Sequence, residues 1–246
     1  MKLTAQVYLL ASGSLGTGMS HASDCNVYGI ECGSEFVIVD SGVGQNSGDI
    51  LKRLAEDGVD AKRVGTLLLT HGHLDHSGGA WFLRERLKAR VAASSATAVA
   101  LESGNQAAIS LTQAKGAGVY AADFPFQACP VDQRLADGQR LSFSAAEIEV
   151  LTTPGHSHDM LSFLFRSEKL CALFSGDTLF YGGRILLSTV YDCSVQDYEK
   201  SLRKIARYQF EGLFPGHGLW VSQGASAHVR AASKALDRLL LPPNLI

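Results

Sequence analysis

Short apolar runs recur along the chain, and they constrain its fold more than any other feature of the sequence. Each run has the length of a β-strand and is bounded by turn residues such as Gly, Ser, Asp and Pro. Hairpin-spaced runs come first, and alternation with helical segments follows, which favours a mixed α/β or α+β sandwich over an all-parallel doubly wound sheet. The predicted strands cover residues 5–11, 27–32, 36–40, 66–70, 90–93, 148–152, 161–165, 170–175 and 212–214.

Helical spacing of apolar residues is clearest between Val195 and Ile205, where Ser194 and Asp197 form an S-x-x-D capping box at the start. A second clear helix is expected over residues 225–241, because one face is apolar and Pro242 and Pro243 follow it. Further helices are expected over residues 49–56, 79–88 and 97–117.

Length and composition limit the class of protein. The 246 residues are 46% hydrophobic, which is enough to bury the core of one large domain, and we predict a single domain over residues 1–246. The formal net charge is −2, so the chain has no overall basic field to gather nucleic acid or an anionic membrane. We therefore expect a small-molecule substrate and no nucleic-acid or membrane partner, while a homo-oligomer stays open.

Cysteine usage and hydropathy indicate a cytoplasmic protein. The five cysteines are an odd number with no C-x-x-C pair, so neither a disulfide framework nor a thiolate zinc site is expected. No apolar run approaches the ~18–20 residues that a membrane span needs.

Four side chains that can bind a metal follow the strand 66–69 within six residues: His71, His73, Asp75 and His76. In an extended chain His71 and His73 project to the same side and can bind one ion. Asp75 and His76 follow where the chain turns toward a helix, so they can point to a second position. The alternative is a loop that is His-rich by coincidence, but this string arises by chance on the order of once in two thousand.

The same arrangement recurs at three later strand ends. His156 follows a strand in the string T-P-G-H, Asp177 in S-G-D-T, and His217 in P-G-H-G. A lone His in a turn is more often a surface residue than a ligand. Together with the first cluster, however, these three residues complete a set of ligands for two metal ions.

These motifs, with Asp40 at the end of strand 36–39, resemble the metallo-β-lactamase-fold hydrolases over essentially the whole chain. The resemblance implies an α+β fold, a four-layer αββα sandwich in which two mixed sheets are flanked by helices. The sequence Gly176 to Phe180 around Asp177 is most similar to the glyoxalase II and lactonase branches.

The resemblance also implies a ligand set. One metal ion takes His71, His73 and His156, the other takes Asp75, His76 and His217, and Asp177 bridges them. Asp40 matches an acid that steadies a ligand histidine through a hydrogen bond. Its alternative role is to cap the turn after the strand, and both roles can hold.

The implied cofactor is two divalent metal ions, with zinc first and iron or manganese also suited to these ligands. Asp75 and Asp177 are the candidate catalytic residues. The expected reaction is attack of a metal-bound hydroxide on an ester-like carbonyl of a small molecule, in a thioester or a lactone. The 29 residues 218–246 after His217 are fewer than the helical glutathione-binding domain of glyoxalase II, so glutathione thioesters are less expected.

Several alternatives stay open. His158, Phe180, Tyr181 and Arg184 are candidate substrate contacts, but His158 is alternatively a solvated turn residue and both aromatic residues are alternatively buried at a strand edge. The segment 104–140 is either an active-site flap or a plain connection. Rival functions are a persulfide dioxygenase-like oxidoreductase with one iron, a phosphodiesterase or nuclease, a β-lactamase, and a non-catalytic binding protein on the same fold.

Overall fold

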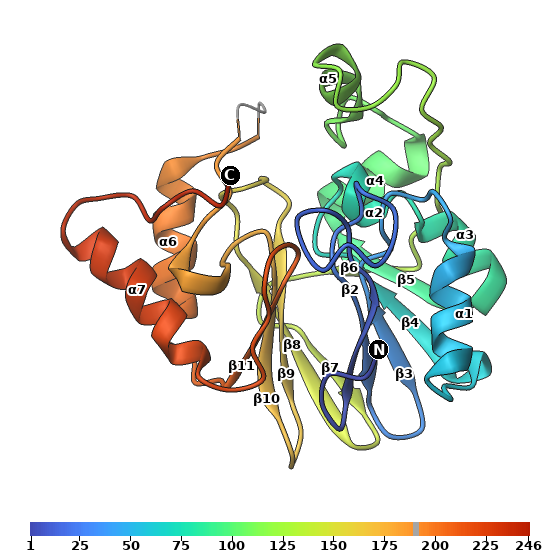
Figure 1. The fold of residues 1–246 in the computed structure, drawn as a ribbon, viewed down its shortest axis with the longest axis horizontal. Helices are drawn as coiled ribbons and strands as arrows, with labels where there is room; N and C mark the ends of the chain where they lie inside the picture. Colours follow the sequence, from blue (N-terminus) through green and yellow to red (C-terminus); the bar gives the residue numbers. More distant parts are fainter. Residues whose placement is uncertain (189–191) are drawn as a thin grey trace. The chain divides into compact units, whose positions relative to one another are not determined.

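The computed structural model describes residues 1–188 and 192–246, which divide into two compact units, Met1–Leu135 and Ala136–Ile246 (Figure 1). Each unit has its own mixed sheet, its own helices and its own apolar core. The single domain predicted over residues 1–246 stays a prediction.

The first unit contains a six-stranded sheet in the order β1-β2-β3-β4-β5-β6. The first three strands are antiparallel neighbours, and those from β3 to β6 are parallel. Parallel neighbours need crossover connections, and helices supply them. The elements are β1 (Val7–Ala11), β2 (Val27–Glu31), β3 (Phe36–Val39), α1 (Gly48–Glu56), η1 (Ala61–Arg63), β4 (Val64–Leu68), α2 (Leu74–Ser77), α3 (Ala80–Leu87), β5 (Arg90–Ser94), α4 (Ser95–Ser103), α5 (Leu111–Gly116) and β6 (Gln133–Leu135).

The second unit contains a five-stranded sheet in the order β11-β10-β9-β8-β7. Only β10 and β11 are parallel neighbours, and α6 lies in the crossover between them (Figure 1). The elements are β7 (Arg140–Phe143), β8 (Ala146–Thr152), β9 (Leu161–Arg166), β10 (Cys171–Gly176), η2 (Tyr181–Gly183), α6 (Val195–Ile205), β11 (Gly212–Pro215) and α7 (Ala225–Asp237).

Helix α6 shows how the sequence pattern becomes packing. The Ser194 hydroxyl accepts a hydrogen bond from the Asp197 backbone N–H, as the capping box predicts. Tyr198, Leu202 and Ile205 are buried in one core cluster with strand residues of β8, β9 and β10. The apolar stripe that predicts this helix is therefore the face that anchors it to the second sheet.

Two short strands escape sequence analysis. Strand β6 has three residues and β7 has four, and exposed or half-buried side chains predominate in both. Such strands carry little apolar signal. The single helix expected over 97–117 is instead two helices, because Gly104 at φ 67° ends α4 in the left-handed conformation.

The C-terminal helix ends earlier than the sequence predicts. Helix α7 ends at Asp237, four residues before the predicted end at 241. Leu239 adopts a φ of 58°, and the backbone N–H of Leu240 donates to the carbonyl of Ala235. This local capping stops the helix before Pro242 is reached, and residues 239–241 are exposed.

Among the described residues, no helix combines the length and the apolar character needed to cross a membrane.

The core of the second unit generates a stability prediction. Leu173 in β10 is fully buried, so Leu173→Ala removes packed apolar volume and should lower the free energy of unfolding by about 2–5 kcal/mol. Leu240→Ala is the matched control, because this side chain is 60% exposed and its loss should change stability by less than about 0.5 kcal/mol. Urea unfolding followed by circular dichroism measures both. Equal midpoints for the two variants would contradict the assigned core.

Candidate metal centre

In the first unit, the histidine cluster begins where β4 ends. Residues 69–73 leave the strand, and helix α2 starts at Leu74 with His73 as its N-cap residue. The ring centroid of His71 lies 4.6 Å from the ring centroid of His73 and 4.1 Å from that of His76. The structure therefore brings together the three histidines that the sequence places in one string.

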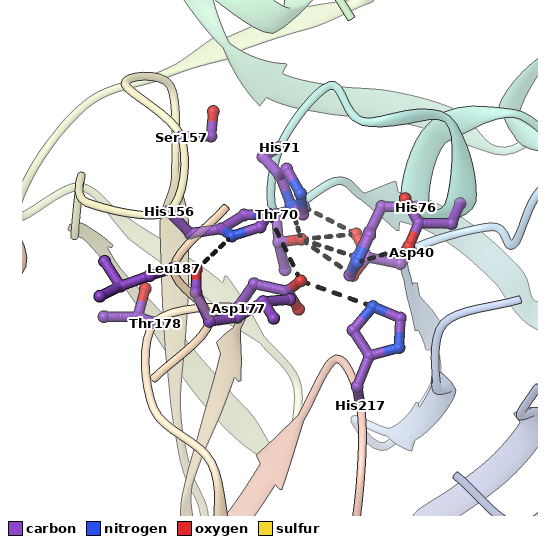
Figure 2. Close-up of polar contacts among 12 residues, drawn as sticks. Asp40, Thr70, His71, His76, His156, Ser157, Asp177, Thr178, Leu187 and His217 are labelled. Atoms are coloured by element: carbon purple, nitrogen blue, oxygen red, sulfur yellow. Dashed lines mark hydrogen bonds and ion pairs between the residues drawn. The ribbon is translucent and has the colours of Figure 1, made fainter. Parts of the chain in front are cut away.

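Asp40 is the buried hydrogen-bonding centre of this cluster (Figure 2). Its backbone has a φ of 64° and donates to the carbonyl of Leu68, which turns its side chain toward the end of β4. The carboxylate accepts hydrogen bonds from the Thr70 backbone N–H at 2.8 Å and from the Thr70 hydroxyl at 2.9 and 3.0 Å. His76 Nδ1 lies 2.8 Å from the same carboxylate. Asp40 thus holds the turn and a histidine at once.

This network assigns the tautomers of two histidines. A carboxylate only accepts hydrogen bonds, so His76 carries its proton on Nδ1 and donates it to Asp40. The Thr70 hydroxyl gives its hydrogen to Asp40, so the contact of 3.0 Å with His71 Nδ1 is a donation from the imidazole. Both rings then present Nε2 as a lone-pair donor, the form in which imidazole binds a metal.

Asp75 and Cys25 complete the first unit's cluster. Asp75 Oδ2 lies 3.7 Å from His76 Nε2, and its side chain is 24% exposed. Cys25 lies close to His76 and Asp40. The cysteine sulfur, a ring nitrogen of His76 and a carboxylate oxygen of Asp40 all lie within 4.8 Å of one another. Burial raises the pKa of Cys25 to about 12, so it is a neutral thiol at neutral pH.

In the second unit, the three candidate ligands project from one edge of the sheet. Strands β10 and β11 are parallel, and β8 runs in the same direction because β9 is antiparallel to both of its neighbours. The carboxyl ends of β8, β10 and β11 therefore lie at the same edge. His156, Asp177 and His217 follow these three ends.

The distances among these three side chains fit shared metal coordination. Asp177 Oδ2 lies 3.5 Å from His156 Nε2 and 3.5 Å from His217 Nε2, and all three side chains are buried (Figure 2). A hydrogen bond between such atoms would be about 2.7–3.2 Å long. Two ligands that each lie about 2.1 Å from one tetrahedral zinc ion are separated by roughly 3.4 Å. The donor set therefore fits divalent metal ions.

His156 also has an assigned tautomer. Its Nδ1 lies 2.9 Å from the carbonyl oxygen of Leu186, which can only accept a hydrogen bond, so Nε2 is left as the metal-binding nitrogen. The preceding Gly155 has a φ of 151°, and a Cβ atom there would lie 2.6 Å from Cγ of Tyr198. Only glycine permits this close approach of the ligand loop to α6.

The candidate substrate contacts have different surroundings. His158 has a side chain that is 52% exposed and lies 3.6 Å from Asp192 Oδ2. Phe180 is fully buried, whereas Tyr181 is 44% exposed. Arg184 is exposed and donates to the carbonyl of Asn244 at 2.8 Å. Exposure leaves His158, Tyr181 and Arg184 accessible to a substrate, and burial favours the packing role for Phe180. Contact with substrate stays a prediction for all four.

In the first-unit part of the segment 104–140, aromatic side chains pack on a core. Tyr120 and Phe124 have ring centroids 4.9 Å apart, and both pack against the core of the first unit. The segment also contains α5 and β6. Its predicted alternative roles, flap or connection, stay predictions.

Asp40 is predicted from the sequence, but three other groups that hold the ligands are not. These are the Thr70 hydroxyl, the Leu186 carbonyl and the Tyr198 hydroxyl, which donates toward the Asp177 carbonyl at 2.8 Å. Burial raises the pKa of Tyr198 well above its ordinary value, so the hydroxyl stays protonated. One signal was available for Tyr198, because a tyrosine in the buried stripe of a helix needs a polar partner inside the protein.

Comparison with known proteins agrees with this description. The family model of the metallo-beta-lactamase superfamily matches residues 22–217, which is most of the chain. The protein therefore belongs to the metallo-beta-lactamase superfamily, as its motifs predict. A solved metallo-beta-lactamase from Cronobacter sakazakii superposes with a TM-score of 0.73 at 15% identity, over 97% of this chain and 95% of that chain. This likeness confirms the predicted α+β fold with two mixed sheets flanked by helices.

Curated relatives include hydrolases and thioesterases. The chain is 31% identical over 202 residues to an atrochrysone carboxyl ACP thioesterase of Aspergillus fumigatus, covering 82% of this chain and 53% of that protein. It is 28% identical over 216 residues to a hydroxyacylglutathione hydrolase of Cereibacter sphaeroides (85% and 67%). It is 27% identical over 232 residues to acyl-coenzyme A thioesterase MBLAC2 of Bos taurus (87% and 79%). The chain thus spans about half the length of the Aspergillus protein.

The Asp40 network generates a metal-affinity prediction. In Asp40→Asn, an amide with one acceptor oxygen replaces a carboxylate that serves Thr70 and His76, and its NH2 group faces a donor. We expect metal affinity to fall by about 10–100-fold. Titration against a chromophoric chelator measures this, with Asp123→Asn as an exposed control in the same unit. Unchanged affinity in Asp40→Asn would show that Asp40 only holds the turn.

Proposed function

We propose that this protein is a metal-dependent hydrolase that cleaves the thioester bond of a small molecule. The observation that carries the proposal is the placement of Asp177 Oδ2 at 3.5 Å from two histidine Nε2 atoms. That spacing is too long for hydrogen bonds and suits ligands of divalent ions. The thioester takes precedence over the lactone because two of the curated relatives are named as thioesterases.

The proposed ligands are those that the sequence predicts, and they are taken to hold two divalent ions, zinc first with iron or manganese as alternatives. They are His71, His73, Asp75, His76, His156, Asp177 and His217. Their chemistry supports this proposal, because neutral imidazole nitrogens and carboxylate oxygens suit these metals. When bound, such ions lower the pKa of water to near 7 and polarise a carbonyl oxygen.

The chain's own residues would orient the ligand histidines, the attacking water and the substrate. Asp40 and the Leu186 carbonyl each hold the Nδ1 proton of a histidine, which fixes the direction of the opposite nitrogen. Asp75 is the proposed residue that accepts a hydrogen bond from the attacking water, because its partly exposed carboxylate lies beside His76. His158, Tyr181 and Arg184 are the proposed contacts for the substrate.

The low net charge of the chain favours a small-molecule substrate over nucleic acid. The net charge of −2 offers no basic field for nucleic acid, and no nucleic-acid or membrane partner is proposed. The structure describes no disulfide among the five cysteines, which supports a reducing compartment, and we propose the cytoplasm.

One substrate panel tests the reaction class. Purified protein with measured metal content is assayed against an acyl thioester, a lactone, a β-lactam, a phosphodiester and a persulfide with oxygen. We expect thioester turnover with two divalent ions per chain. Phosphodiester turnover alone, or oxygen consumption with one iron per chain, would overturn the proposal.

Removal of single ligands gives the sharper prediction. His71→Ala and Asp177→Asn should lose bound metal and turnover together, with activity reduced by at least about 100-fold, because the charge stabilisation in the site is lost. Elemental analysis and the thioester assay are run on the same samples. His21→Ala is the control, since this histidine lies outside the proposed ligands. A His71→Ala protein that keeps its full metal content refutes the ligand assignment.

A further inference from the structure

Tyr198 is a buried tyrosine of α6, and its hydroxyl group forms hydrogen bonds with backbone groups. The hydroxyl oxygen lies 2.8 Å from the carbonyl oxygen of Asp177 and 2.9 Å from that of Leu186. It also accepts a hydrogen bond of 3.2 Å from the Leu186 backbone N–H. One hydroxyl therefore ties together two loops that are distant in the sequence.

Both of these loops support proposed metal ligands. The Leu186 carbonyl accepts the Nδ1 proton of His156 at 2.9 Å, so its position sets the orientation of that imidazole. The Asp177 carbonyl belongs to a proposed ligand itself, and the Asp177 carboxylate lies 3.5 Å from His156 Nε2. The Tyr198 hydroxyl is thus hydrogen-bonded to the Leu186 carbonyl, which is the partner of His156 Nδ1. It is also hydrogen-bonded to the backbone carbonyl of Asp177.

Helix α6 is fixed by hydrogen bonds to the loop that precedes His156. The Ser194 backbone N–H donates to the Gly155 carbonyl at 2.7 Å, and the Ser201 hydroxyl donates to the Pro154 carbonyl at 2.6 Å. Tyr198 also sits so close to Gly155 that a Cβ atom there would collide with it. These contacts lock the helix against the loop that leads to His156.

We propose that Tyr198 is a positioning residue for the metal ligands His156 and Asp177. Its hydroxyl fixes the Leu186 carbonyl that orients His156, and it fixes the backbone from which the Asp177 carboxylate projects. The inference rests on the proposed function, because it assigns Tyr198 a role toward bound metal.

A purely structural role makes a different prediction. The Tyr198 ring packs in the core with Leu202 and Ile205, so its hydroxyl could serve only the stability of the fold. In that case its removal would destabilise the metal-free and metal-loaded protein equally, and metal affinity would not change. A positioning role lowers metal affinity, and it therefore reduces the extra stability that metal binding confers.

The experiment compares Tyr198→Phe with Tyr208→Phe. The first variant keeps the buried ring and removes the hydroxyl, and the second removes a hydroxyl in the same unit that lies 3.3 Å from Glu149 Oε1. Zinc affinity is measured by competition with a chromophoric chelator, and the visible spectrum is recorded with cobalt(II) in place of zinc. Thermal unfolding is followed with and without zinc.

We expect Tyr198→Phe to bind zinc about 10-fold or more weakly, to gain a smaller thermal shift from zinc, and to show an altered cobalt spectrum. Tyr208→Phe should match the unsubstituted protein in all three. Tyr198→p-aminophenylalanine restores a hydrogen-bond donor at the same place and should recover the affinity.

Two results overturn the positioning role alone. One is an unchanged zinc affinity and cobalt spectrum in Tyr198→Phe, even if that variant unfolds at a lower temperature. The other is a failure of p-aminophenylalanine to recover affinity. If the unsubstituted protein binds no metal, the proposed function itself fails and the positioning role fails with it.

Discussion

The candidate site depends on one kind of interaction: the ring nitrogen of a histidine that does not face the metal donates a hydrogen bond, which fixes the tautomer and the orientation of the imidazole. His76 makes this hydrogen bond to Asp40 at 2.8 Å, and His156 makes it to the Leu186 carbonyl at 2.9 Å. Both partners can only accept a hydrogen bond, so both imidazoles present Nε2. The strands and helices serve to bring such partners to the ends of the strands.

Two unusual backbone conformations accompany these hydrogen bonds. Asp40 adopts the left-handed conformation, which is uncommon for a residue with a side chain but tolerated by Asp. It is retained here because the carboxylate then reaches both Thr70 and His76. Gly155 serves the second unit similarly, since it lets the loop before His156 approach Tyr198 closely. Asp40 and Gly155 thus place two unusual backbone conformations beside candidate ligands.

The apolar strands and the loops that follow them are predictable, because each strand is a short run of apolar residues and each loop begins with turn-forming residues. The string from His71 to His76 and the face of α6 are predictable for this reason. The end of α7 is not, because the left-handed Leu239 stops the helix without Gly or Pro at that position. Strands β6 and β7 are also missed, since they are short and weakly apolar.

The partners of the ligands are harder to predict, and for different reasons in the two units. Asp40 is a side-chain partner, so its identity is visible in the sequence and a resemblance can suggest it. The partner of His156 is a backbone carbonyl, and every residue has one, so the sequence at Leu186 carries no signal.

This difference also changes how each ligand can be perturbed. Support from Asp40 ends when its own side chain is replaced, whereas the Leu186 carbonyl survives any substitution except through the groups that hold the backbone. In the second unit, the orientation of His156 therefore depends on the residue that holds the Leu186 backbone. That residue is Tyr198, whose hydroxyl forms hydrogen bonds with the backbone N–H and carbonyl of Leu186.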